Sequence, residues 1–149
     1  MEAARLDSHE GATISLTVPA KPEYVIVCRL ALDGLADAET VTAEVLSDLK
    51  LAVTEACANS ISHAYDNGDG AVTLQIDVLD DRILIEVTDQ GTGIATEDRV
   101  ATDIAAPEAL EAGGMGIALI SALVDELDIS PGRGGRGTRV VFAKRLAPA

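Results

Sequence analysis

Alternating apolar and polar side chains, the period of a half-buried strand, recur in several short segments of the chain. Pro19 ends the first segment, because proline cannot donate a hydrogen bond to a neighbouring strand. Leu79, Asp80 and Asp81 separate two consecutive segments, so that pair is predicted to form a hairpin. The predicted strands are residues 13–18, 72–78, 82–89, 127–130 and 138–145.

Helical spacing of apolar residues predicts three helices, over residues 22–34, 41–65 and 116–127. This order of elements predicts an α+β fold, a two-layer α/β sandwich in which the helices cover one face of a mostly antiparallel sheet. On the longest helix, one apolar stripe lies within about 40 degrees of Val53 and should face the sheet. The stripe consists of Leu46, Leu49, Val53, Cys57 and Ala64.

Residues 1–149 are expected to form a single domain, because a chain of this length without an internal repeat or a linker is of single-domain size. Residues 1–11 are polar and acidic and are expected to be flexible. Residues 91–114 have weak periodicity, with only a short helix predicted near 97–103. A connection this long is typical of a functional lid, which we assign to residues 95–112.

The charge and composition exclude several classes of partner. Eleven lysines and arginines against 25 aspartates and glutamates give a net charge of −14, so DNA, RNA and anionic membranes are not expected partners. One phenylalanine, two tyrosines and no tryptophan leave no stacking platform for single-stranded nucleic acid. No signal-peptide core is present, and the longest apolar stretch, 117–124, is too short to span a bilayer, so we expect a cytoplasmic protein. Cys28 and Cys57 are expected to be free buried thiols.

The positive charges gather near the C-terminus, where five of the eleven cations lie in the last 17 positions. They either form a local anion site or balance charge along a solvated strand edge. These residues are Arg133, Arg136, Arg139, Lys144 and Arg145.

Glu55 and Asn59 stand four residues apart on the long predicted helix, so their side chains rise about 6 Å apart along one face. That face of the helix lies opposite the core stripe. Glu55 and Asn59 are either ordinary residues of a solvated surface or a functional pair. An amide oxygen suits Mg²⁺ that also binds phosphates, and a carboxylate one turn earlier can accept a proton from an attacking hydroxyl. His63, a further turn along, is interpreted as a capping or packing residue, and no zinc site is expected.

Asp89 ends a predicted strand and precedes Gly91 and Gly93, whose missing β-carbons let a flat ring approach closely. A carboxylate there would accept a hydrogen bond from an exocyclic amine, which favours adenine over guanine. Gly114 and Gly116 precede a helix whose N-terminal N–H groups can bind phosphates. The chain has no P-loop, no dinucleotide-binding GxGxxG and no HRD or DFG pair, so a different nucleotide fold is required.

Four stretches in this order resemble the N, G1, G2 and terminal boxes of the Bergerat-fold ATPases, the superfamily of gyrase, histidine kinases and heat-shock chaperones. They are ExxxN at 55–59, DxGxG at 89–93, GxG at 114–116 and GT at 137–138. Within that superfamily, the sequences EACANSISHAY, DQGTGI and GGMGIALI look like those of the RsbW-type anti-sigma-factor serine kinases of bacterial stress and sporulation control.

The resemblance implies a Bergerat ATP-binding fold that holds Mg-ATP. It implies that Glu55 is the general base, that Asn59 binds the metal and that Asp89 accepts from the adenine amine. It further implies that the remaining nucleotide contacts lie beside the adenine ring and at the phosphates. The ring contacts would be Gly91, Gly93 and Thr138, and the phosphate contacts Gly114, Met115 and Gly116.

The same resemblance implies a kinase that phosphorylates a serine of an anti-anti-sigma factor, that sequesters a sigma factor and that forms a homodimer. Arg29 is then either a partner contact or an ordinary exposed arginine. The lid carries Arg99 as its only cation among several carboxylates, so it supplies little positive charge to hold phosphates. This is the reason for an alternative hypothesis, a nucleotide-gated binding module without significant kinase activity. A third hypothesis, the detached catalytic half of a two-component histidine kinase, would require a separate protein with the phospho-acceptor histidine.

Overall fold

A computed structural model of the chain describes residues 12–35, 41–64, 70–89, 115–132 and 137–146. Within these residues five strands form one antiparallel sheet, in the order β1-β2-β3-β5-β4. All five predicted strands are present, two of them with the predicted bounds. They are β1 (Ala12–Pro19), β2 (Ala71–Val78), β3 (Arg82–Asp89), β4 (Glu126–Pro131) and β5 (Thr138–Arg145).

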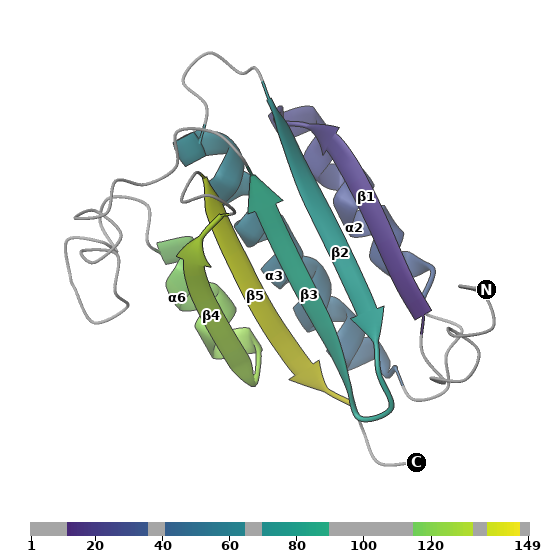
Figure 1. The fold of residues 1–149 in the computed structure, drawn as a ribbon. Coiled ribbons are helices and arrows are strands. Elements are labelled where there is room, and N and C mark those ends of the chain that lie inside the picture. The colour runs from purple at the N-terminus through teal and green to yellow at the C-terminus, as the bar shows by residue number, and fades with distance from the viewer. Residues whose placement is uncertain (1–11, 36–40, 65–69, 90–114, 133–136, 147–149) are drawn as a thin grey trace, which may run out of the picture.

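The helices of the described residues cover one face of this sheet, behind it in Figure 1, so the predicted α+β sandwich is confirmed. A 3-10 turn, η1 (Pro22–Tyr24), leads into α2 (Val25–Asp33), which ends next to Gly34. The other two helices are α3 (Ala43–Ala64) and α6 (Met115–Leu123). No helix in the described ranges is long and apolar enough to cross a membrane.

The predicted end of the third helix at residue 127 is wrong, because α6 ends at Leu123. The backbone N–H of Asp125 already donates to the Ala143 carbonyl at 2.9 Å, and β4 begins at the next residue. The apolar residues Val124 and Leu127 continue the helical spacing but belong to the connection and the strand. Periodicity over such a short segment does not distinguish a helix end from a buried strand.

The core lies between the sheet and α3. Alternate residues of the central strands face the helices and are fully buried, as Leu74, Ile85 and Phe142 illustrate. On α3 the predicted stripe is confirmed for three of its members, since Leu49, Val53 and Cys57 are 0%, 0% and 1% exposed. Leu46 is only half-buried, and the side chain of Ala64 lies outside the described residues. Cys28 and Cys57 are free and buried, as expected.

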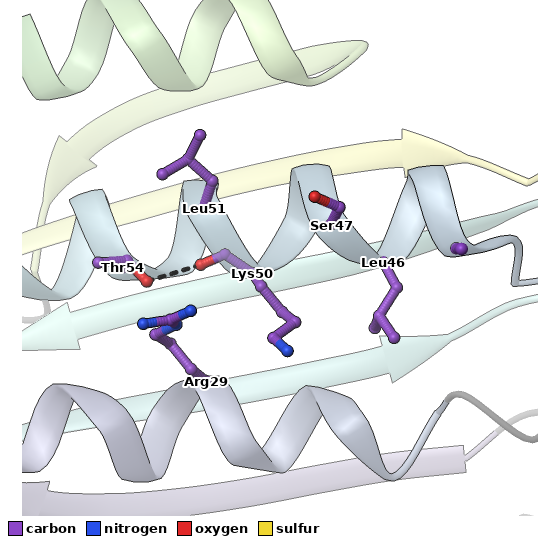
Figure 2. Close-up of a pocket in the computed structure, with 7 residues that line it drawn as sticks. Arg29, Leu46, Ser47, Lys50, Leu51 and Thr54 are labelled. Atoms are coloured by element: carbon purple, nitrogen blue, oxygen red, sulfur yellow. Dashed lines mark hydrogen bonds between the residues drawn. The ribbon is translucent and has the colours of Figure 1, made fainter.

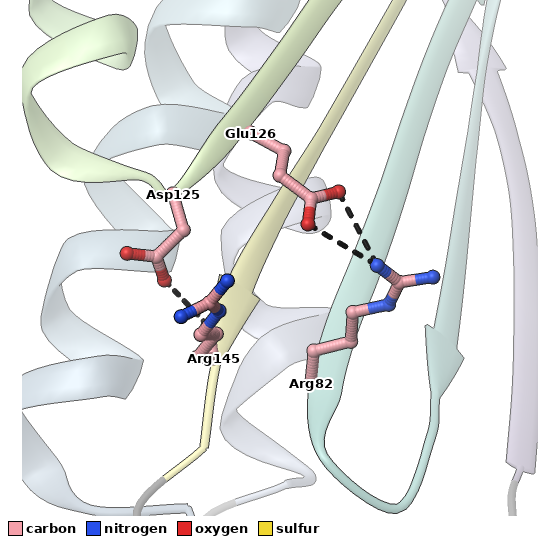
Figure 3. Close-up of polar contacts among 4 residues, drawn as sticks. All are labelled: Arg82, Asp125, Glu126 and Arg145. Carbon is pink, nitrogen blue, oxygen red and sulfur yellow. Dashed lines mark hydrogen bonds and ion pairs between the residues drawn. The ribbon is translucent and has the colours of Figure 1, made fainter.

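The opposite face of the sheet bears no helix in the described residues and is polar. Thr17 and Thr73 hydrogen-bond across β1 and β2 at 3.0 Å, and Arg139 forms an ion pair with Glu86 at 2.9 Å. Arg82 reaches both carboxylate oxygens of Glu126 on this face (Figure 3).

Two of the C-terminal cations, Arg139 and Lys144, form ion pairs with carboxylates. Arg139 pairs with Glu86, and Lys144 pairs with Asp48 at 3.0 Å. The backbone N–H of Arg145 donates to an Asp125 carboxylate oxygen at 2.7 Å (Figure 3). The other two cations of this group, Arg133 and Arg136, lie outside the described residues, as do residues 1–11 and the lid assigned to 95–112.

Candidate functional site

The predicted site residues that the structure describes lie at one end of the molecule, on the helix-covered side of the sheet. The C-terminal half of α3, the start of α6, the end of β3 and the start of β5 all lie at this end (Figure 1). Because α3 packs against both β3 and β5, its polar residues and the strand ends belong to the same layer. Segments that are far apart in the sequence therefore meet here.

Glu55 of α3 lies directly beside Gly116 of α6. A β-carbon added to Gly116 would stand 3.1 Å from the Oε1 atom of Glu55, which is closer than ordinary van der Waals contact. Glycine at this position therefore lets the carboxylate approach the first turn of α6. The N–H groups of a first helical turn have no partner inside the helix and attract anions such as phosphate. A carboxylate and a helix N-terminus thus lie side by side.

Asn59 follows Glu55 by one turn on the same side of α3, as its spacing predicts. Both residues are half-buried, and Asn59 takes part in a polar interaction of its own. The carboxylate and the amide thus lie along one side of α3, and the carboxylate is the one shown next to α6. The amide oxygen offers the hard, neutral ligand that Mg²⁺ accepts together with phosphate oxygens and water.

Asp89 ends β3 with its side chain on the helix side of the sheet, as the alternation after Val87 requires. It is 2% exposed and lies opposite Val72 of β2 in the strand register. The residue takes part in a polar interaction, as a carboxylate this buried must. A carboxylate held at this strand end would be able to accept a hydrogen bond from a ligand.

Gly137, which immediately precedes the neighbouring strand β5, lies against Asp89. A β-carbon on Gly137 would stand 2.0 Å from the Asp89 carbonyl oxygen, and Gly137 has a φ of +71°, in the left-handed region. Only glycine fits this position without a clash. The structure therefore adds Gly137 as a site residue that sequence reasoning noted only as part of the GT motif. Thr138, the first residue of β5, is 7% exposed.

Several predicted site residues cannot be placed. Gly91, Gly93 and Gly114 lie outside the described residues, as does the lid. Met115 begins α6 and His63 lies near the end of α3, but their side chains are not among those described. The roles implied for these residues stay predictions. The described part of the chain contains no cluster of three or more His, Cys, Asp or Glu side chains able to hold a metal ion.

The described residues fit a magnesium nucleotide. A buried carboxylate with a close-packed glycine, Asp89 with Gly137, offers an acceptor and a tight backbone for a flat base. The start of α6 offers N–H groups for phosphates, and the Asn59 amide offers an oxygen for the metal. The net negative charge of the protein does not prevent binding of an anionic nucleotide, because charges more than roughly 8 Å away are screened at physiological salt.

A second feature lies between α2 and α3, away from these residues. Arg29 of α2 and Leu46, Lys50 and Leu51 of α3 help to line a hollow of about 430 Å³ (Figure 2). Lys50 is held by an ion pair with Asp33 at 2.8 Å. Beside the hollow, large apolar side chains are exposed on both helices. They are Ile26 at 55%, Val27 at 36%, Leu30 at 57% and Leu51 at 42%.

A polar hollow of about 600 Å³ lies on the open face of the sheet, lined by residues that include Thr73, Glu86, Thr88 and Arg139. Strand alternation places these side chains on the side opposite the helices. The hollow therefore lies on the other side of the sheet from Glu55 and α6, and Asp89 at the end of β3 also lines it.

Comparison with known proteins agrees with this fold. The family profile of the histidine kinase-like ATPase domain matches residues 18–144. A protein of Halalkalibacterium halodurans named serine-protein kinase RsbW is 39% identical over 131 residues, which cover 85% of this chain and 80% of that protein. A protein of the same name from Bacillus licheniformis is 37% identical over 139 residues, which cover 89% and 86% of the two chains.

Two solved structures share the fold. The RsbU and RsbW domains of Rv1364c from Mycobacterium tuberculosis match with a TM-score of 0.63 and 22% identity, over 93% of this chain and 34% of that one. The SiaB-SiaC complex from Pseudomonas aeruginosa matches with a TM-score of 0.62 and 16% identity, over 97% and 95%. At these identities the likeness concerns the arrangement of helices and strands.

Proposed function

Since the chain belongs to the histidine kinase-like ATPase domain family and is an ATP-dependent serine-protein kinase of the RsbW group, we propose that it acts as an anti-sigma factor. It phosphorylates a serine of an anti-anti-sigma factor, and it holds a sigma factor in an inactive complex when that antagonist is phosphorylated. The observation that carries this proposal is the contact between Glu55 and the first turn of α6. A carboxylate beside a helix N-terminus suits the transfer of a phosphate to a serine hydroxyl.

Glu55 is the general base in this proposal. Its carboxylate accepts the proton of the target serine hydroxyl as the oxygen attacks the terminal phosphate. The N–H groups at the start of α6, including that of Gly116, bind the phosphates and stabilise the charge that develops during transfer. Gly114 and Met115 extend this cradle at the preceding positions.

Asn59 holds Mg²⁺ through its amide oxygen, and the metal neutralises the charge of the phosphates when it is bound. Asn59 orients the nucleotide relative to Glu55, because the two side chains are one turn apart on a rigid helix. At the other end of the site, Asp89 accepts a hydrogen bond from the adenine amine. Thr138 packs beside Asp89, and Gly91 and Gly93 flank the ring.

The partner proteins bind outside the nucleotide site, with Arg29 as one contact. Support comes from the apolar side chains of Ile26 and Leu30, which are more than half exposed next to this cation. An interface commonly combines such an apolar centre with an arginine. We also propose that the protein acts as a homodimer in the cytoplasm, where a sigma factor is available to be sequestered.

The test separates nucleotide binding from transfer. Calorimetry with Mg-ATP should show binding to the wild-type protein and a loss of affinity of at least about tenfold for Asp89→Asn, which replaces an acceptor oxygen by a donor. Glu55→Gln should keep this affinity but lower the rate of transfer to the antagonist protein by about 10² or more. Wild-type binding without any phosphoserine in the antagonist would instead support the nucleotide-gated binding module. Absence of Mg-ATP binding would contradict both functions.

A further inference from the structure

Lys144 of β5 contacts both α3 and α6. It does so at the end of the α3–α6 contact, called the seam below, that is remote from Glu55. Its Nζ atom donates to the Leu123 carbonyl oxygen at 2.7 Å and forms an ion pair with the Oδ2 atom of Asp48 at 3.0 Å. The side chains of Lys144 and Asp48 are only 20% and 26% exposed, so water screens this pair less than an ordinary surface pair. Leu123 ends α6, where a carbonyl lacks a partner inside the helix and a cation is favourable.

The spacing of these contacts defines how the two helices lie together. Asp48 precedes Glu55 by seven residues on α3, and Leu123 follows Gly116 by seven residues on α6. Seven residues are close to two helical turns, so each pair lies on one face of its helix. Glu55 meets Gly116, and Lys144 joins Asp48 to Leu123. The helices are therefore antiparallel, as Figure 1 shows, with two contacts about 10 Å apart.

We propose that Lys144 is a positioning residue that sets the register of α6 along α3 and thereby holds the first turn of α6 against Glu55. The apolar side chains of α6, such as Ile117 and Ile120, are buried in the core. Apolar contact is non-directional and by itself sets the position along the seam only loosely. The charged contact of Lys144 with both helices is directional.

The consequence for activity rests on the proposed function, in which Glu55 and the start of α6 act on the same phosphate and hydroxyl. A displacement of about 1 Å between reacting groups can cost up to 10²-fold in rate. Loss of Lys144 should therefore reduce transfer more than it reduces nucleotide affinity, because the phosphate contacts move together with α6 while Glu55 stays on α3.

The experiment compares Lys144→Met, Lys144→Arg and Asp48→Asn with a matched control, Arg82→Met. Methionine keeps the length of the side chain and removes the charge. Arg82 lies on β3 next to Ile83, the register partner of Lys144. It faces the open side of the sheet and pairs with Glu126 there at 3.2 Å (Figure 3). The control thus removes a paired cation from the same end of the sheet without touching α3 or α6.

Transfer of phosphate from Mg-ATP to the antagonist serine is measured at a temperature at which circular dichroism shows every variant folded. Lys144→Met should lower kcat about tenfold and change the KM for ATP less than threefold. Lys144→Arg should restore at least half of the rate, because it keeps a cation beside Asp48 and Leu123. Asp48→Asn should show a smaller loss, since the Leu123 contact remains. Equal rates for Lys144→Met and Arg82→Met would overturn the proposal.

A second readout does not depend on activity. Hydrogen exchange of the α6 backbone amides near Ile120 should be at least about tenfold faster in Lys144→Met than in Arg82→Met, because a charged hydrogen bond is lost. Exchange in α2 should be the same in both variants. Unchanged exchange in α6 would refute the positioning role. If the wild-type protein fails to bind Mg-ATP, the proposed function is wrong, whereas the exchange comparison still decides whether Lys144 holds α6.

Discussion

Gly137 packs against Asp89 so closely that a β-carbon at position 137 would stand 2.0 Å from the Asp89 carbonyl oxygen and 2.8 Å from its Oδ1 atom. Asp89 ends β3, and Gly137 immediately precedes β5, the strand that pairs antiparallel with β3. The shape of the predicted adenine site therefore depends on the absence of one side chain.

Gly137→Ala is expected to lower the free energy of unfolding by about 2 to 4 kcal/mol, because it adds left-handed backbone strain to a clash with backbone atoms. Mg-ATP affinity should fall as well, since Asp89 must shift. Urea unfolding and calorimetry measure the two effects. Gly34→Ala is the matched control: Gly34 has a φ of −65°, and its added β-carbon would meet Ala31 at an ordinary 3.6 Å. A Gly137→Ala protein as stable as the control would contradict this view of the contact.

Gly116→Ala should have the opposite profile, with stability kept and transfer impaired. Alanine is favoured over glycine in a helix by up to about 1 kcal/mol, so the unfolding free energy should stay level or rise. The new β-carbon, 3.1 Å from Oε1, pushes the Glu55 carboxylate by a few tenths of an ångström, and kcat should fall about tenfold. Urea unfolding and a phosphoserine assay distinguish the two quantities. A stable variant with full kcat would show that Glu55 tolerates the displacement.

Arg29→Glu is expected to weaken binding of the sigma factor or of the antagonist by at least about tenfold, the usual effect of losing an interface anchor. Mg-ATP affinity should not change, because Arg29 lies on α2, away from the nucleotide residues. Surface plasmon resonance with the purified partner measures the loss. Lys21→Glu makes the same charge reversal at an exposed residue before η1 and serves as the control. Equal losses of affinity in the two variants would show that Arg29 acts only through the overall charge of the protein and is not a specific partner contact.

The two cysteines should give the folding stability a particular pH dependence. A hydrogen bond from Cys57 lowers the pKa of Cys28, whereas that bond and burial raise the pKa of Cys57. A lowered pKa makes the fold gain stability as the pH rises toward the ordinary thiol pKa of about 8.5, and a raised pKa makes it lose stability above that value. The unfolding free energy of the wild type minus that of Cys28→Ala/Cys57→Ala should therefore peak near pH 8.5.

Urea unfolding at a series of pH values from about 7 to 10 measures this difference, since both proteins share every other titrating group. A difference that does not rise between about pH 7 and 8.5 would contradict the lowered pKa of Cys28 and the hydrogen bond that causes it.

Local pattern was a good guide to the elements of this chain. The strands over 82–89 and 138–145 have the predicted bounds, because a two-residue period depends only on neighbouring side chains. The α3 stripe of Leu49, Val53 and Cys57 is likewise buried as its spacing predicts. The predicted end of α6 was wrong, because contacts with β5 end the helix at Leu123 although the apolar pattern continues beyond it.

The role of Arg29 is a second point that the sequence could not decide. Its position among apolar residues of a predicted helix left open whether it is a partner contact or an ordinary exposed arginine. The structure places it in a hollow with Leu46 and Leu51, residues that come from another helix. No sequence pattern around Arg29 contains that neighbour, so the surface could be found only after the helices were packed together.

The amino-acid sequence by itself determined the elements, their amphipathic faces and the four-residue spacing of Glu55 and Asn59, because each of these follows from local backbone geometry. Only the tertiary structure decided that Gly116 touches Glu55, that Gly137 touches Asp89 and that Lys144 joins two helices. The residues of each contact are at least 21 positions apart in the chain. Their contacts depend on how the sheet and helices pack, which is a property of the whole core.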